Sequence, residues 1–331
     1  MPTVRTVTVK SSGGDYTSLS AAEAGEQADL PALDRQTNIE VYDFTDTTTV
    51  DITGWTTDAT RYINIYAAVG NGHSGTWDNS KYNLSISAAF GGALAVRENY
   101  VRVTGLQFDC THVTSAGTPV GTVDVIGASD VRFERCIARR TGAQAGNMIV
   151  SHTAGTATLR NCIFYQNTDS HAVRGAGGTL IIQNCTITAA AGDGIHNFFD
   201  ASTITVDNTY SGGHTGAAYA GAMTRTTCAH SSATVFSGST ASIAYSTANF
   251  VNVTTGSQNL HLIVGASATL LTGGTDKSGT YTVDIDNQTR TDWSIGADEF
   301  VEVVASALIA LHHMFKSRMF NTKFIRTKSS N

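Results

Sequence analysis

The sequence predicts an all-β fold, a single-stranded parallel β-helix in which short strands coil into rungs that stack as a solenoid. Five stretches share one pattern, at residues 101–106, 131–136, 157–162, 180–185 and 204–209. In each stretch the first and third residues are apolar, a spacing typical of a strand with alternate side chains facing inward. The sixth residue recurs after 30, 26, 23 and 24 residues, an interval typical of solenoid rungs.

The fifth residue of the pattern predicts a sharp bend in each rung. It is Gly or Asn in four of the five stretches, and both residue types tolerate left-handed backbone. A second short strand follows each bend and begins in three rungs with Cys136, Cys162 and Cys185. Stacking brings these cysteines into one interior column, where we expect buried free thiols. Five cysteines without a CxxC pair indicate neither a disulfide framework nor a zinc site, and we expect no metal or cofactor.

Residues 1–37 are expected to cover the open N-terminal end of the solenoid, which otherwise exposes unpaired strand edges. Residues 3–10 alternate as a strand, and residues 17–30 are expected to form a capping helix that turns Leu19, Ala22 and Leu30 toward the first rung. The β-helix itself is expected over residues 38–300. Inward pairs in its early rungs are Ile39 with Val41, Ile63 with Ile65, and Leu84 with Ile86.

The pattern weakens between residues 211 and 260. The apolar residues expected to line narrow rungs there are Val235, Ile243, Tyr245 and Phe250. Two motifs, at residues 284–290 and 294–300, close the body, and we expect Arg290 to pair with Asp298 or Glu299 and fasten the last turn.

Taken together, these motifs resemble the right-handed parallel β-helix superfamily, the pectate-lyase-like fold of polysaccharide lyases, glycoside hydrolases and many phage proteins. The regular columns at about 100–210 carry the resemblance, the motif at residues 13–19 resembles the usual N-terminal cap, and the two closing motifs resemble those of bacterial and phage chains. The resemblance implies a right-handed coil. It specifies the fold well and the activity poorly, because function depends on sites added to a fold.

Residues 301–331 differ from the body and are expected to form an anchoring helix followed by a basic arm. No acidic residue follows Glu302, so residues 303–331 carry +5 while residues 1–302 carry −11. An apolar and basic segment on an acidic body predicts docking onto another virion protein, of the capsid or tail. The residues expected to make this anchor are Leu308, Ile309, Leu311, Met314, Phe315, Lys316, Arg318, Lys323 and Arg326.

The sequence has no basic start followed by an apolar core, so we expect a chain that folds in the host cytoplasm and is not secreted. No run of ~18 apolar residues predicts a membrane span. The acidic body does not favour nucleic-acid binding.

One group of polar residues could carry chemistry. If Ser170–Val173 lies against Asp193–His196, Asp169, His171 and Arg174 meet Asp193 and His196 within ~5–10 Å. Carboxylates that close could share a proton or a metal. Asp, His and Gly are also ordinary residues of solvated turns, so these five are weak candidates for catalysis or glycan binding. Aromatic residues that could stack on sugars, or pack between subunits, are Trp55, Trp77, Tyr82, Phe198 and Phe199.

We therefore expect a phage virion structural protein, a β-helical capsid decoration (cement) or spike protein, forming a homotrimer and anchored through its C-terminal tail. The alternatives are a polysaccharide-binding receptor spike that contacts surface glycans and a polysaccharide lyase or hydrolase. The missing export signal favours a particle assembled inside the cell. The lack of an acidic, calcium-type cluster argues against an enzyme.

Overall fold

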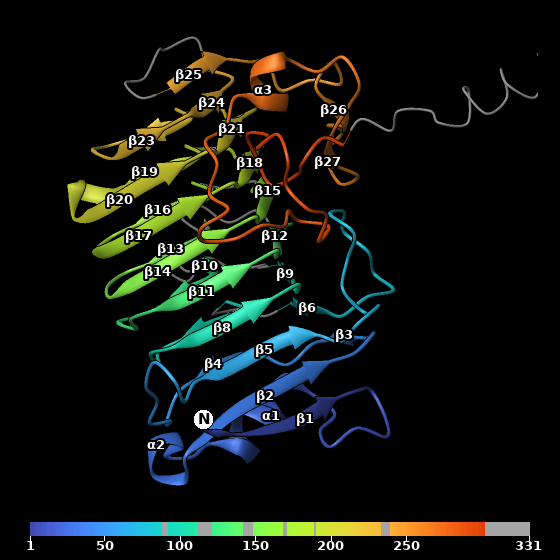
Figure 1. Ribbon diagram of the computed structural model, residues 1–331, viewed down its shortest axis with the longest axis vertical. Coiled ribbons are helices and arrows are strands. Elements are labelled where there is room, and N and C mark those ends of the chain that lie inside the picture. The colour runs from blue at the N-terminus through green and yellow to red at the C-terminus, as the bar shows by residue number, and fades with distance from the viewer. Residues whose placement is uncertain are drawn as a thin grey trace, which may run out of the picture. The chain divides into compact units, whose positions relative to one another are not determined.

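Within residues 1–300, three parallel β-sheets stack their strands in successive rungs and enclose one apolar interior (Figure 1). The computed structural model describes residues 1–301 except 88–91, 112–120, 142–147, 168–170, 189 and 233–238. Residues 1–300 form one unit, an all-β parallel solenoid, which confirms the predicted fold class. Asp169, Val235 and all nine anchor residues lie outside the described residues.

The first sheet contains the strands that the sequence pattern predicts. They are β1 (Thr3–Val9), β2 (Arg35–Val41), β5 (Ile63–Ala67), β8 (Val101–Thr104), β11 (Val131–Glu134), β14 (Thr156–Arg160), β17 (Gly178–Gln183), β20 (Ser202–Asp207) and β23 (Thr224–Thr226). Equivalent residues pair in register along the stack, as Val131 with Ala157 and Leu180 with Ile204. All four of these side chains are buried, as the pattern requires.

The third sheet holds the strands that follow the bends. They are β3 (Thr45–Asp46), β6 (Asn83–Ile86), β9 (Gln107–Cys110), β12 (Ile137–Arg140), β15 (Ile163–Asn167), β18 (Thr186–Thr188), β21 (Tyr210–Gly212), β24 (Cys228–His230) and β25 (Ser239–Ser242). All five cysteines are buried free thiols, and the backbone N–H of Cys136 lies 3.5 Å from Cys162 Sγ in the rung above. The cysteine column is thus confirmed as packing.

The second sheet supplies a third strand to each rung, which the sequence pattern had placed in loops. Its members are β4 (Val50–Ile52), β7 (Leu94–Val96), β10 (Gly121–Val125), β13 (Met148–His152), β16 (Val173–Gly175), β19 (Ile195–Asn197) and β22 (Tyr219–Ala220). These strands are mostly three to five residues long. The loops before them vary in length, so they keep no fixed distance from the bend and no period in the sequence.

The predicted bends join the first sheet to the third. Every fifth-position residue has a left-handed φ: Gly105 (73°), Arg135 (52°), Asn161 (51°), Asn184 (46°) and Asn208 (46°). Arg135 shows that the rung requires this conformation even of a residue that does not favour it.

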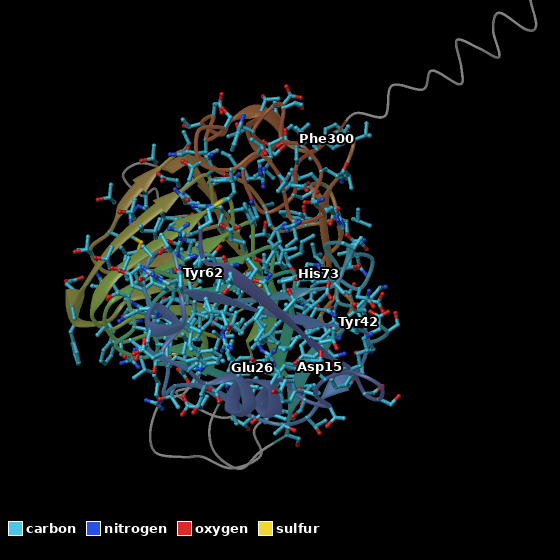
Figure 2. The ribbon with its side chains drawn as sticks, turned by 60° about the horizontal axis from the view of Figure 1, so that its bottom comes forward. Asp15, Glu26, Tyr42, Tyr62, His73 and Phe300 are labelled. Carbon is cyan, nitrogen blue, oxygen red and sulfur yellow. The ribbon has the colours of Figure 1, made fainter. Side chains whose placement is uncertain are left out.

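Two short helices, α1 (Leu19–Glu26) and α2 (Leu30–Leu33), replace the single helix expected over residues 17–30. Ser18 caps α1 by accepting the N–H of Ala21, and Asp29 begins α2, in which Pro31 occupies the first turn. Leu19, Ala22 and Leu30 are fully buried, as predicted. Glu26 lies at this end of the unit (Figure 2), where its carboxylate accepts Arg5 Nη2 at 2.6 Å.

Parallel pairing ends at β25, and residues 249–300 fold back over the outer face of the third sheet. This closing segment contains the antiparallel pair β26 (Phe250–Asn252) and β27 (Asn259–Leu262) and the helix α3 (Ala268–Thr272). Ile243 and Phe250 belong to an apolar cluster that also contains Ile137 and Ile163 and is separate from the cluster of the solenoid interior. The expectation that they line narrow rungs is therefore wrong, because the chain has left the solenoid by Ile243.

The closing segment is fastened by the predicted arginine. Arg290 Nη1 lies 3.2 Å from Glu299 Oε2, and both side chains are fully buried. Glu299, not Asp298, is thus the partner. None of the described helices is long and apolar enough to cross a membrane.

Candidate functional site

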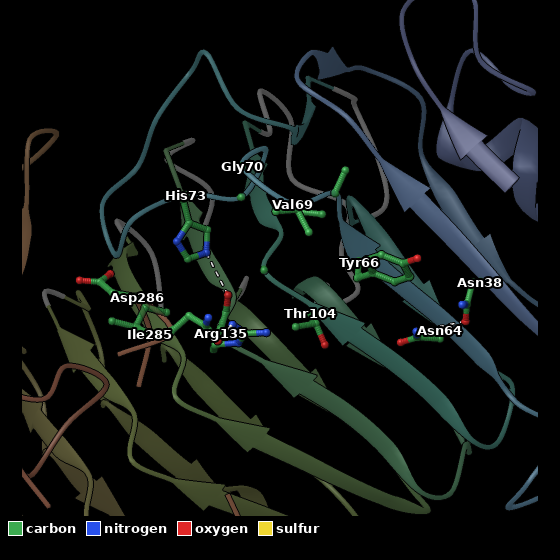
Figure 3. Close-up of a pocket in the computed structure, with 15 residues that line it drawn as sticks. Asn38, Asn64, Tyr66, Val69, Gly70, His73, Thr104, Arg135, Ile285 and Asp286 are labelled. Atoms are coloured by element: carbon green, nitrogen blue, oxygen red, sulfur yellow. Dashed lines mark hydrogen bonds between the residues drawn. The ribbon is translucent and has the colours of Figure 1, made fainter. Parts of the chain in front are cut away.

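A groove lies over the outer face of the first sheet, above β2, β5, β8 and β11. It contains a hollow of about 580 Å³ and a second hollow of about 240 Å³, and the two share Asn64 and Thr104. The side chains that point outward from alternate strand positions form its floor, so the same period that fills the interior also lines the groove. Figure 3 shows Asn38, Asn64, Tyr66 and Thr104 side by side on this floor.

The floor presents a ladder of hydrogen-bonding groups. Asn64 Nδ2 donates to Asn38 Oδ1 at 3.2 Å, and Gln36 Nε2 donates to the same oxygen at 2.9 Å. Each asparagine amide offers both a donor and an acceptor, so the ladder keeps free bonding capacity toward the groove. Register places Asn38, Asn64 and Arg102 in one outward column across three strands.

One wall of the larger hollow is the loop that carries His73. Its Nε2 lies 2.9 Å from the carbonyl oxygen of Arg135, and its Nδ1 accepts the N–H of Gly75 at 3.2 Å. These two contacts assign the proton to Nε2. Burial lowers the pKa of His73 to about 4, so the ring is neutral at pH 7. Through its hydrogen bond to Arg135 the ring holds the loop in place (Figure 3).

The opposite wall comes from the closing segment. Arg135 Nη1 donates to Asn287 Oδ1 at 2.5 Å, and Ile285, Asp286 and Asn287 complete the lining. Gly75 lets the two walls meet, because a Cβ at this position would lie 2.4 Å from Asp286 Oδ1 and 2.5 Å from His261 Nε2. Its φ of +68° independently favours glycine.

Behind this wall, His261 forms an acidic group with Asp286 and Asp298, of which Asp298 is buried and the other two are partly exposed. His261 Nε2 lies 2.7 Å from Asp286 Oδ2, which raises the pKa of His261 against the opposing effect of burial. Asp298 Oδ2 accepts the N–H of Leu262 at 2.7 Å, and burial raises the pKa of Asp298 to about 7. The group holds the wall in position, and only Asp286 of the three lines the hollow.

The smaller hollow is rich in arginine, and aspartate neutralises part of its charge. Arg102 Nη2 and Arg132 Nη2 both contact Asp130, at 2.5 and 3.0 Å. Glu134 pairs with Arg160 at 2.7 Å. The groove therefore offers amides, hydroxyls, guanidinium groups and the ring of Tyr66 to a ligand, a mixture suited to a polar and extended molecule.

The weak candidates identified from sequence lie elsewhere, beside the second sheet. The structure brings three of them together: Asp193 Oδ2 lies 3.0 Å from His171 Nδ1 and 3.2 Å from His196 Nδ1. The register is one residue from the expected one, since Val173 pairs with Ile195. This shift places His171 beside Asp193 and makes the contacts shorter than expected.

Arg174 pairs in register with His196, but its guanidinium lies 3.8 Å from the ring of Phe198 and is directed toward that ring. Asp169, the fifth candidate, lies outside the described residues. Burial and the neighbouring imidazole of His196 lower the pKa of His171, which favours its neutral form.

The aromatic candidates divide between packing and exposure. Trp55 is buried and donates Nε1 to Glu23 at 3.0 Å, and Tyr82 is buried against Asp46. Trp77 holds the guanidinium of Arg139 3.7 Å from its ring, and Phe199 is 85% exposed. None of the five lines the groove.

The groove residues escaped the sequence analysis because that analysis examined turns and apolar columns. The available signal was the run of polar residues at outward positions of neighbouring strands, such as Asn38, Asn64 and Thr104. The walls left no such signal: Arg135 and Asn287 are 152 residues apart in the chain.

No protein-family model matches this chain, and no curated protein matches it. Among solved structures, pectate lyase Pel9A is similar with a TM-score of 0.41 and 14% sequence identity, over 90% of this chain and 96% of that chain.

Proposed function

We propose that this protein binds an extended saccharide chain along the groove over β2, β5, β8 and β11. The observation that carries the proposal is the pair of adjoining hollows, which share Asn64 and Thr104 and are lined by hydrogen-bonding side chains. Stacked rungs repeat their outward groups every ~4.8 Å, so a repeating polymer meets equivalent groups at each step.

The chemistry of the groove suits sugar hydroxyls. Asparagine amides donate and accept at once, as a hydroxyl does, and the ring of Tyr66 offers an apolar edge to the faces of pyranose rings. Arg102 and Arg132 add positive charge, which favours saccharides that carry carboxylates. The ligand class is therefore a polar glycan, with acidic sugars preferred.

Glycan-array screening followed by calorimetric titration of the best oligosaccharide tests the proposal. We expect Asn64→Ala to weaken binding by about 10-fold or more, because it removes two hydrogen-bonding groups from the floor. Thr205→Ala is the matched control, since Thr205 occupies the same outward column at β20 beyond the groove. Binding that is equally strong in both variants would refute the groove as the site.

Cleavage is the competing outcome. If the protein releases unsaturated or reducing sugar from the bound glycan, and Asp286→Asn or Glu134→Gln abolishes that release, the groove is the site of a lyase or hydrolase. Stable binding without sugar release supports a binding protein.

We also propose, as a second function, that the protein is a structural component of a phage virion, present as a homotrimer and attached to a capsid or tail protein through residues 301–331. The charge distribution favours this: residues 303–331 carry +5 and follow a body of −11. Deletion of residues 303–331 should leave a folded body that no longer joins virion particles, and a truncated chain that still assembles would refute the anchor.

A further inference from the structure

We propose that His171, Asp193 and His196 form a binding site for a divalent transition-metal ion, best suited to Zn²⁺. The site lies beside β16 and β19 of the second sheet and is separate from the saccharide groove on the first sheet. It does not depend on the function proposed above.

The three ligand atoms already have the spacing of a coordination sphere. Asp193 Oδ2, His171 Nδ1 and His196 Nδ1 form a triangle with sides of 3.0, 3.2 and 3.2 Å. Bonds of about 2.1 Å to one Zn²⁺ ion place ligand atoms ~3.0 Å apart at a 90° angle and ~3.4 Å apart at the tetrahedral angle. An ion can therefore join all three atoms without backbone movement.

The two imidazoles already lie in direct contact, so little movement is needed for them to share an ion. His196 Nδ1 lies 2.8 Å from His171 Nε2, and the rings meet edge to face at 82°. Without an ion, one nitrogen must carry a proton and the other must not. The terminal χ torsion of histidine is soft, so both rings can turn their lone pairs toward a shared ion, at the expense of contacts such as the long 3.2 Å hydrogen bond that His171 Nδ1 accepts from the N–H of Asp193.

The protein holds the carboxylate in place from the next rung. Asp193 Oδ1 accepts the N–H of Ala217 at 2.8 Å, which leaves Oδ2 directed at the two imidazoles. Such outer contacts orient metal ligands in proteins. Since the ligands come from the segment just before β16, the turn before β19 and β19 itself, the ion would join two successive rungs.

The chemistry of the ligands selects the ion. Two imidazoles and one carboxylate suit Zn²⁺ and its neighbours in the first transition row, whereas Ca²⁺ and Mg²⁺ prefer all-oxygen sites. The three side chains are 18–24% exposed, which gives the ion a route from solvent and leaves a position for water. The positive charge of Arg174 is close, but it is directed onto Phe198 at 3.8 Å.

Calorimetric titration of the untagged, EDTA-treated full chain with Zn²⁺ tests the site, and Co²⁺ absorption reports the ligand geometry. We expect the wild-type chain to bind one equivalent of Zn²⁺. Asp193→Asn and His196→Gln should each abolish this binding or weaken its affinity by at least about 100-fold. Asp193→Asn keeps an oxygen for Ala217 N–H, so its fold should persist, which circular dichroism checks. His261→Gln is the matched control, because His261 belongs to the other histidine–aspartate group of the described residues and should leave this equivalent unchanged.

Thermal unfolding provides a second measurement that needs no variant. Zn²⁺ at about 100 times its Kd should raise Tm by about 4 °C, and excess EDTA should reverse the shift. Unchanged stoichiometry and affinity in both ligand variants, or loss of the equivalent in His261→Gln, would overturn the assignment. So would wild-type protein that binds Zn²⁺ only in the millimolar range.

Discussion

Substitution of Arg290 should release the closing segment from the solenoid. Its guanidinium donates to Asn161 Oδ1 at 2.8 Å, to the carbonyl oxygens of Gly296 and Ala297 at 3.0 and 2.7 Å, and to Glu299 at 3.2 Å. All of these groups are buried. Arg290→Ala therefore removes one ionic partner and leaves several acceptors without a donor.

The size of the effect follows from the buried pair. Removal of one member of such a pair costs about 3–5 kcal/mol, because the other charge stays buried. The Glu299 carboxylate also accepts the backbone N–H groups of residues 291–294, which keeps the loss at the lower end of that range. With an unfolding entropy of about 2.1 cal/mol/K per residue, and 300 residues in the unit, a loss of about 3–4 kcal/mol corresponds to a decrease in Tm of about 5–6 °C.

Differential scanning calorimetry measures this decrease, and near-ultraviolet circular dichroism reports on Trp293, which lies beside Arg290. Arg97→Ala is the matched control: its pair with Asp51 has the same kind of contact, at 3.0 Å, but both side chains are nearly half exposed. That exposed pair is expected to contribute less than about 1 kcal/mol. Equal changes of Tm in the two variants would refute the reasoning.

Three further substitutions test the closing segment and the groove. Burial raises the pKa of Asp298 from 3.8 to about 7, so the folded protein keeps a proton that the unfolded chain loses, and the free energy of unfolding should fall as pH rises from about 4 to 7. Asp298→Asn should remove most of this decline of about 4 kcal/mol, measured by urea unfolding at several pH values. Asn184→Ala should destabilise the protein by about 1 kcal/mol more than Asn184→Gly, because only alanine adds left-handed strain to the lost hydrogen bonds; equal denaturation midpoints would contradict this. Gly75→Ala should displace the His73 loop and weaken glycan binding about 10-fold with little change in Tm, and unchanged affinity would show that the loop is not a wall of the site.

The sequence was sufficient for the features that repeat. The bends could be predicted from Gly105, Asn161 and Asn184, because few other residue types adopt left-handed backbone without strain. The interior could be predicted because apolar residues such as Val131 and Leu180 recur at every second position of a strand. The second sheet was missed because β16 and β19 follow loops of variable length. The group of His171, Asp193 and His196 was found by aligning Ser170–Val173 with Asp193–His196, although one residue of shift decided which atoms touch.

Features that depend on the closing segment could not be predicted. No local sequence pattern indicates that the chain reverses after Ser242 and covers the third sheet. The apolar residues after Ser242 pack in an outer cluster, but the same residues would suit a solenoid interior equally well. The pairing of Arg290 was foreseen only as a choice between Asp298 and Glu299. Burial of Glu299 among four N–H groups decides that choice, and this arrangement exists only after the turn at residues 291–294 has formed.

The residue type in the column of bends determines where the groove can open. At Asn161, Asn184 and Asn208 the side-chain amides donate to carbonyl oxygens of Val283, Ser294 and Thr275, so the closing segment covers these later bends. At the two earlier bends the column holds Gly105 and Arg135, which offer no such amide, and both line the larger hollow. The asparagines that permit the bend thus also bind the closing segment. At Arg135 the closing segment is bound through Asn287 instead, and there it forms a wall of the larger hollow.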